Sequence, residues 1–187
     1  VDDPLAAQIF KTISEEHIGE MSFFRVYSGK VNAGDDLRNT TRNNSEKMRQ
    51  IYFINGNKRI DAAQLIAGDI GAALKLKNTH TGDTLSSPKS PILLPAIKYP
   101  TSNMSFAVKP KARGDEEKIA NGLAVMHEVD PTFFYRVDPE LKQTIISGQG
   151  ELHLNIALKQ ISERFHVELE KHIPKVPYRE TITGNAN

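Results

Sequence analysis

Four prolines in one short stretch constrain this chain more than any other feature. Pro88, Pro91, Pro95 and Pro100 all lie between Ser86 and Thr101. Proline cannot donate a hydrogen bond to a helix or to a sheet ladder, so this density predicts an extended, semi-rigid connector. The 187 residues are long enough for two modest cores, one on each side of the connector. The parts expected from this division are a domain over 1–90, a linker over 91–101 and a domain over 102–174.

The first part has the pattern of an antiparallel β-barrel or sandwich. Its short alternating runs are broken by Gly-Asp pairs, in which glycine tolerates positive φ and aspartate can bond its own turn. These pairs are Gly34-Asp35, Gly68-Asp69 and Gly82-Asp83. The polar stretch from Asn39 to Lys47 predicts a hairpin tip.

Two runs in this part predict which faces are buried. Apolar residues alternate from position 70 to 76, so their face is expected to point inward. That face consists of Ile70, Ala72, Leu74 and Leu76. The run Phe23–Tyr27 is apolar on both faces, which predicts a strand covered on each side.

The second part predicts the order strand, helix, strand, strand, helix, strand. This is the split βαβ or ferredoxin-like arrangement, an α+β fold with two helices on one face of a four-stranded sheet. The expected elements are a strand over 104–108, a helix from Asp115 to Asp130, strands over 133–137 and 143–147, a helix to about Phe165, and a strand around 167–169.

The segment Thr144–Leu154 runs from a β-branched strand through Gly148 and Gly150 into the second helix. Glycines before a helix N-terminus can let backbone N–H groups cradle a phosphate. Glu151, however, puts a carboxylate in the first helical turn, where such an anion would sit. We therefore interpret the glycines as a tight strand-to-helix corner.

Several chemistries lack their signatures in the sequence. No Gly-x-x-x-x-Gly-Lys-Ser/Thr loop is present, and without cysteine there is no thiolate ligand or nucleophile. His166 and His172 would share a face only if one strand held both, and no third metal ligand has a useful spacing. The net charge of +1 gives no single-sign field, and no apolar run approaches the ~20 residues needed to cross a bilayer. We expect a cytoplasmic protein with no metal, no catalytic residues and no membrane partner.

Five sequence blocks resemble, in order and spacing, domains II and III and the start of domain IV of the elongation factor G family. The blocks are Phe23-Phe24-Arg25-Val26-Tyr27-Ser28-Gly29, Ala67-Gly68-Asp69-Ile70, Thr81-Gly82-Asp83-Thr84-Leu85, Asp130-Pro131-Thr132-Phe133 and Tyr178-Arg179-Glu180-Thr181-Ile182. The corner Ile146-Ser147-Gly148-Gln149-Gly150-Glu151-Leu152-His153-Leu154 is similar to the same family's third domain. Residues 175–187 are expected to begin a truncated following domain.

The sequence departs from the usual pattern of this family at three places. Glu15-Glu16 stands where the family usually has Asp-Pro, and Gln149 and Asn155 stand where methionine and glutamate are common. These departures leave open a divergent paralogue rather than the housekeeping factor. Release factor three and the ribosomal protection proteins of tetracycline resistance have similar middle domains.

The resemblance implies a non-catalytic middle section of a ribosome-binding translational GTPase that acts in translocation. The translation-factor β-barrel would lie on small-subunit ribosomal RNA and protein. The second domain would relay the nucleotide state between the GTPase domain and the anticodon-mimicking domain. GTP and Mg²⁺ would belong to the parent protein, with no cofactor in this section. The alternatives are a free-standing ferredoxin-like enzyme, such as an acyl-phosphate hydrolase using Arg113, and a generic RNA-binding barrel.

Two sets of residues are candidates for contacts with partners. Basic side chains on strands and tips of the barrel are placed to reach RNA phosphates. They are Arg25, Lys30, Arg42, Lys47 and Arg49. The resemblance also places Thr132 and His153 toward the GTPase domain. From helix periodicity His153 lies ~100° from Leu154, so either it faces a partner or its ring caps the strand-to-helix corner.

Overall fold

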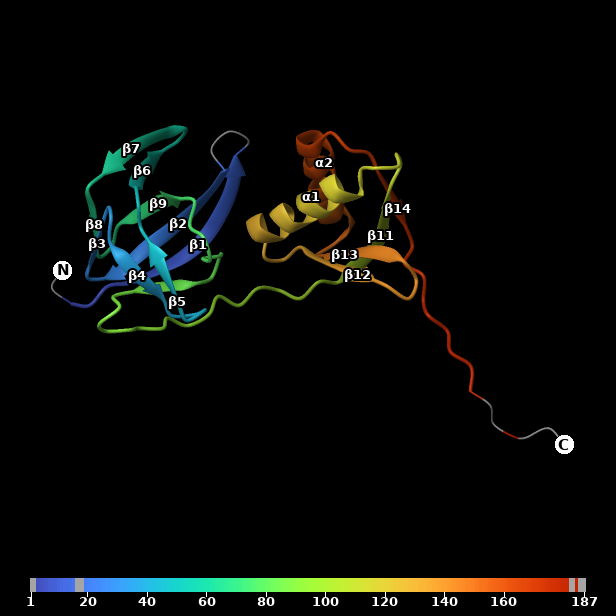
Figure 1. The fold of residues 1–187 in the computed structure, drawn as a ribbon, viewed down its shortest axis with the longest axis horizontal. Helices are drawn as coiled ribbons and strands as arrows, with labels where there is room; N and C mark the ends of the chain where they lie inside the picture. The colour runs from blue at the N-terminus through green and yellow to red at the C-terminus, as the bar shows by residue number, and fades with distance from the viewer. Residues whose placement is uncertain (1–2, 16–18, 182–183, 185–187) are drawn as a thin grey trace. The chain divides into compact units, whose positions relative to one another are not determined.

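The computed structural model describes residues 3–15, 19–181 and Gly184. The chain forms two compact units. The first comprises the residues up to Tyr99 together with Glu128–Pro131, and the second comprises Pro100–His127 and the residues from Thr132 onward. Each is described by itself. Figure 1 shows their elements along the chain. Glu16 of the pair Glu15-Glu16 and Ile182 of the block Tyr178–Ile182 lie outside the described residues.

The first unit, over its described residues, is built from ten β-strands that all pair antiparallel. Eight form one sheet in the order β5-β4-β10-β1-β2-β9-β6-β7, and β3 pairs with β8. The strands are β1 Ala6–Glu15, β2 Gly19–Ser28, β3 Lys30–Asn32, β4 Asp36–Asn39, β5 Asn44–Lys47, β6 Ile51–Asn55, β7 Lys58–Ala62, β8 Gln64–Ile66, β9 Ile70–Leu74 and β10 Thr84–Ser86. A single apolar core that includes Ile9, Phe24, Val26, Met48 and Leu85 lies inside them. The predicted β-barrel is confirmed.

The predicted inward face over 70–76 is only partly right, because Ala72 is fully buried and Leu76 lies in the barrel core, but Ile70 points outward. Ile70 is 52% exposed, whereas Ala73 is buried in the barrel core. Gly71 also faces the core, since a Cβ built there would lie 2.2 Å from Cδ1 of Leu65. A larger residue at position 71 would displace Leu65, and this packing contact sets the register.

The expectation that β2 is covered on both sides is also wrong. Phe24 and Val26 are fully buried on the inner face, but Tyr27 is 51% exposed on the outer one. The guanidinium of Arg25 lies 5.3 Å from the centroid of the Tyr27 ring. The outer face of β2 is therefore an aromatic and cationic surface open to solvent.

The proline-rich segment is fastened to the barrel along its first half. The carbonyl of Ile92 accepts a hydrogen bond from Thr40 Oγ1 (2.8 Å), and that of Pro95 accepts one from Gln8 Nε2 (3.0 Å). The backbone N–H of Leu94 donates to Thr84 Oγ1 at 3.3 Å. Because side chains satisfy these backbone groups, the segment follows the barrel surface without joining its ladder.

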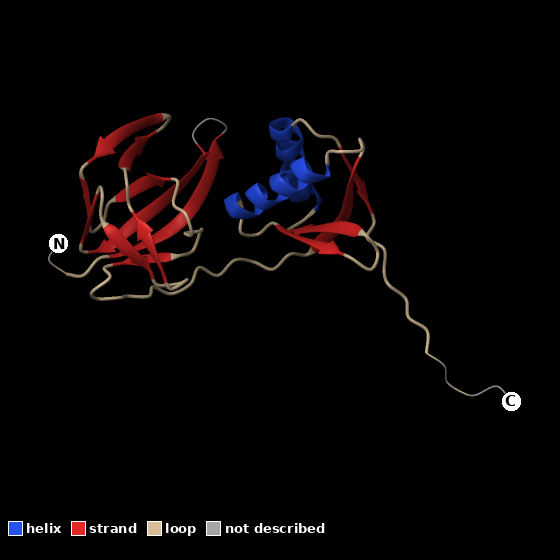
Figure 2. Cartoon of the chain, in the orientation of Figure 1, coloured by secondary structure: helices blue, strands red, loops and turns tan. Residues whose placement is uncertain are grey.

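The second unit, over its described residues, has four strands and two helices, and its sheet order is β12-β13-β11-β14. This is the predicted ferredoxin-like topology, and Figure 2 shows both helices on one face of the sheet. The elements are β11 Met104–Pro110, α1 Glu116–Val129, β12 Phe134–Asp138, β13 Gln143–Gly148, α2 Glu151–Phe165 and β14 Leu169–His172. The helix that was predicted to begin after Asp115 and stop at Asp130-Pro131 is α1.

The core of this unit lies between the two helices and one face of the sheet. Phe133, Ile146 and Leu154 are fully buried in it. The helices approach closely at Gly122 of α1, where an added Cβ would lie 2.7 Å from Cγ2 of Ile161 in α2. Glycine is therefore required here for space, not for an unusual φ.

No helix among the described residues is long and apolar enough to cross a membrane. Beyond β14, the chain from Ile173 to Thr181 has no regular secondary structure. Its backbone is held at Lys175 by the side chain of Gln143, and the guanidinium of Arg179 lies 3.2 Å from Glu140.

Candidate functional site

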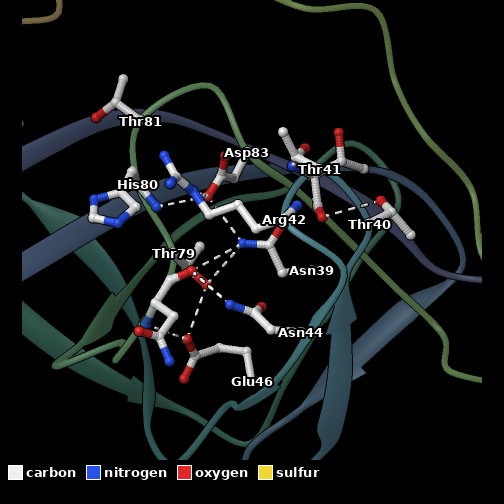
Figure 3. A network of polar contacts seen from close by, with 12 residues as sticks. Asn39, Thr40, Thr41, Arg42, Asn44, Glu46, Thr79, His80, Thr81 and Asp83 are labelled. Atoms are coloured by element: carbon white, nitrogen blue, oxygen red, sulfur yellow. Dashed lines mark hydrogen bonds and ion pairs between the residues drawn. The ribbon is translucent and has the colours of Figure 1, made fainter.

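A buried polar network holds the β4–β5 hairpin against the loop that precedes β10 (Figure 3). Its first centre is Asp83, whose side chain is only 4% exposed. Oδ2 of Asp83 accepts hydrogen bonds from Asn39 Nδ2 (2.9 Å), Arg42 Nε (2.7 Å) and the backbone N–H of His80 (2.9 Å). A buried carboxylate is stable only with such partners, so Asp83 fixes all three donors in place.

The second centre of the network is Glu46, which is also buried. Its carboxylate accepts hydrogen bonds from the backbone N–H groups of Lys77 (3.1 Å) and Asn78 (3.1 Å) and from the hydroxyl of Thr79 (2.9 Å). Asn39, which is fully buried, links the two centres because its Nδ2 also donates to the Asn78 carbonyl. The polar stretch predicted as a hairpin tip therefore forms a hairpin, but its polar side chains at 39 and 46 are structural.

Arg42 is the candidate cation most affected by this network. Its Nε is committed to Asp83, and its backbone N–H donates to Asn39 Oδ1 at 3.1 Å. The side chain is nevertheless 47% exposed, so the rest of the guanidinium faces solvent at a fixed position. Arginine can pair with a second anion while one donor is occupied, because its five N–H groups form a rigid fork.

The other candidate cations lie on different strands and loops of the barrel, and Lys30 and Lys47 both lie beside Asp36. Lys30 lines a hollow of about 430 Å³ together with Asp35 and Asp36. Lys47 lies 3.7 Å from the Asp36 carboxylate, in a pair that is exposed on both sides. Arg25 is on β2 over Tyr27, while Arg49 is exposed between β5 and β6. Whether any of them contacts RNA remains a prediction.

The second candidate region is the corner between β13 and α2. The backbone N–H of Gln149 donates to Nδ1 of His153 at 3.0 Å, so the ring caps this corner. A Cβ at Gly148 would lie 2.7 Å from the same nitrogen, which explains why this position is glycine. The His153 ring also meets Phe133 edge-on, with centroids 6.5 Å apart.

Phe133 brings the two predicted interdomain residues together, because it directly follows Thr132 and contacts His153. Thr132 and His153 are both half-buried. Both residues therefore lie near the corner between β13 and α2. Their contact with another domain stays a prediction. The capping alternative weighed for His153 is the arrangement that the structure has.

Sequence reasoning missed His127 as a structural residue of the same region. Its Nδ1–H donates to the carbonyl of Phe133 at 2.6 Å, and its ring lies 5.4 Å from that of Phe134 and 6.1 Å from that of Tyr135. These contacts fix the turn that follows α1. A histidine in the last helical turn ahead of Asp130-Pro131 was the available signal, since basic side chains there commonly bond backbone carbonyls.

Ion pairs and hydrogen bonds lower the pKa of three carboxylates in the second unit. The hydrogen bond from Lys171 (2.8 Å) lowers the pKa of Glu151, and one from Lys109 lowers that of Glu170. The backbone N–H of Leu141 is the largest cause of the lowered pKa of Asp138. All three groups favour the charged form in the folded protein.

The histidines do not form a metal site within the described residues, where no three His, Asp or Glu side chains are grouped to hold a metal ion. His166 follows the end of α2 with a left-handed φ of 51°, whereas His172 is the last residue of β14. The two therefore do not lie on one strand. Arg113, the candidate for an enzyme, is exposed in the loop before α1.

Comparisons with known families match both units in order. The family model described as Elongation factor G domain 2 matches residues 4–88, and the one described as Elongation Factor G, domain III matches residues 99–172. The barrel and the ferredoxin-like unit thus correspond to two successive domains of a translation factor. The chain belongs to the elongation factor G family.

A solved structure is similar over almost the whole chain. It is a crystal structure of a protein from Thermus thermophilus, with a TM-score of 0.83 and 28% sequence identity. The match covers 95% of this chain and 27% of that one. The chain therefore spans about a quarter of the length of this relative.

Proposed function

We propose that this chain is the non-catalytic middle section of a ribosome-binding translational GTPase that acts in translocation. The observation that carries the proposal is the pair of family matches, one to each unit and in the family's order. In this role the barrel docks on small-subunit RNA and protein. The second unit relays the nucleotide state between the GTPase domain and the anticodon-mimicking domain.

GTP and Mg²⁺ bind, in this proposal, to the GTPase domain of the parent protein. The parent works in the cytoplasm because translating ribosomes are there. The side chains that this section offers are those of a docking surface: exposed cations on the barrel and one corner of the second unit at Thr132 and His153.

Association of the full-length protein with isolated small ribosomal subunits tests the barrel's role. The variant Lys47→Glu/Arg49→Glu is expected to weaken pelleting with the subunits and to flatten its salt dependence, because each lost phosphate contact reduces the slope by about 0.9. Lys89→Glu is a matched control, since Lys89 is exposed on the barrel outside the candidate set. An unchanged salt slope in the double variant would count against these two residues. No pelleting of the unmodified protein would count against the proposed function.

A further inference from the structure

The face of the second sheet that the helices leave open carries a basic hollow. Val108 packs into the helix-side core, so its strand neighbours Ala107 and Lys109 face the other way. On this side a hollow of about 690 Å³ lies between β11, the end of β14 and the turn before β13. It is lined by Ala107, Val108, Lys109, Leu141, Lys142, Gln143, Lys171, His172, Ile173 and Lys175.

The lysines around this hollow outnumber the nearby carboxylates, which are Glu170 and Asp138, the latter bonded by the backbone of Leu141 and the side chain of Gln143. Glu170 lies 3.0 Å from Lys109 and 3.3 Å from His172, and no carboxylate is among the described residues that line the hollow. The ammonium of Lys171 is bonded to Glu151, on the helix side. Within the described part of the chain, the ammonium groups of Lys142 and Lys175 form no ion pair.

Both of these free lysines are held in place by the fold. The side-chain amide of Gln143 binds the Lys175 backbone twice, accepting from its N–H at 3.0 Å and donating to its carbonyl at 3.0 Å. Lys142 has a left-handed φ of 48°, a conformation that costs about 1 kcal/mol or more for a residue with a Cβ. Lys142 and Lys175 are far apart in sequence, but both line the same hollow.

We propose that this hollow binds phosphate groups of an RNA backbone, independently of base sequence. Lysine ammonium groups are compact point charges that suit phosphate oxygens. No Phe, Tyr or Trp is among the described residues that line the hollow, so it lacks the stacking surface with which proteins read unpaired bases. The choice of RNA over an acidic protein rests on the proposed function. The hollow adds a second RNA contact outside the barrel.

Direct RNA binding by the whole chain tests this proposal without ribosomes. The probe is a labelled RNA duplex of about 20 base pairs, titrated over a range of salt concentrations. The test variant is Lys142→Asn/Lys175→Gln, in which asparagine tolerates the left-handed backbone and both charges are removed. The control is Lys159→Gln, which removes a 75% exposed lysine from α2.

The double variant is expected to bind the duplex about tenfold more weakly and to reduce the salt slope by about 1.8, two contacts at about 0.9 each. Lys159→Gln should bind as the unmodified chain does. Equal losses in both variants would overturn the site, as would tighter binding of polyglutamate than of the duplex, which would identify an acidic-peptide surface. Failure of the proposed function would appear differently, as loss of small-subunit binding by the unmodified full-length protein.

Discussion

Asp83 is the residue on which the barrel's polar network most depends. We predict how much stability the barrel loses when Asp83 or its partner is substituted. Asp83→Ala leaves three donors without their shared acceptor, one of them on the fully buried Asn39. Asn39 keeps other acceptors at 3.2 Å, and the half-exposed Arg42 can turn to water. The cost is then about 2 kcal/mol, from roughly 1–3 kcal/mol for the backbone N–H of His80, the one donor left unsatisfied.

Two further variants separate charge from shape. Asp83→Asn can keep an oxygen at the position of Oδ2 and should cost about half as much, since only the charge assistance is lost. Arg42→Ala removes a half-exposed partner and should cost about 1–2 kcal/mol. A loss for Asp83→Asn equal to that for Asp83→Ala would show that the charge, rather than the oxygen geometry, dominates.

Hydrogen exchange measured by mass spectrometry is the suitable assay, because it reports on each unit separately and the chain has no tryptophan. Amides of β4, β5 and β10 should lose protection in proportion to the lost stability, while amides of α1 and α2 serve as an internal control. A change of less than about 1 kcal/mol in the barrel for Asp83→Ala would refute the reasoning.

Three other changes have distinct expected outcomes. Gly29→Ala should destabilise the barrel by about 2–4 kcal/mol in the same exchange assay, because φ is 68° and the new Cβ would lie 2.5 Å from the Asp3 carbonyl; a loss under about 1 kcal/mol would contradict this. Gly122→Ala should cost the second unit about 1–2 kcal/mol in urea unfolding, because the clash with Ile161 outweighs the gain of about 1 kcal/mol in helix propensity. The control is Asn121→Ala at an exposed position of the same helix, which should show no loss of stability. Glu151→Gln should make the second unit's stability less dependent on acid: the folded-state pKa of Glu151 is lowered from 4.5, so its contribution is present above that value and is lost as pH falls through the folded pKa. Equal acid sensitivity of the variant and the unmodified chain would contradict this.

The order of elements in the second unit was predictable because its helices and strands carry local signals. Residues Asp115 and Asp130-Pro131 bracket α1, and aromatic and β-branched residues mark β12 and β13. The close approach of Gly122 to α2 was not predictable, since it depends on which faces of two helices meet. The clamp of Gln143 on Lys175 joins residues far apart in sequence, and no local pattern reports it.

In the barrel, the sequence-based prediction of a solvent-exposed hairpin tip failed at polar residues that the fold buries. Asn39, Glu46 and Asp83 have the composition of a solvated turn, yet the fold buries all three. Donors satisfy the two carboxylates, and the amide of Asn39 donates to Asp83. Polar residues are mostly exposed, so the rule that predicts a surface tip is right on average and wrong here. RNA contacts are hard to predict from sequence for the same reason. A basic side chain has the same sequence signature whether it faces solvent or pairs with a buried carboxylate, and Arg42 pairs with the buried Asp83.

His153 shows how a structural contact changes the design of a functional test. Because Nδ1 accepts from the Gln149 backbone, His153→Ala should cost the second unit about 1–3 kcal/mol, from one lost hydrogen bond and one lost aromatic contact. Loss of activity in that variant would therefore not by itself identify an interdomain contact. His153→Asn is the matched variant, since its side-chain oxygen can take the place of Nδ1 and keep the cap. If the ring faces another domain, the full-length His153→Asn protein should lose ribosome-dependent activity while urea unfolding of the second unit shows most of its stability retained. Full activity in His153→Asn together with loss in His153→Ala would assign the residue to the corner alone.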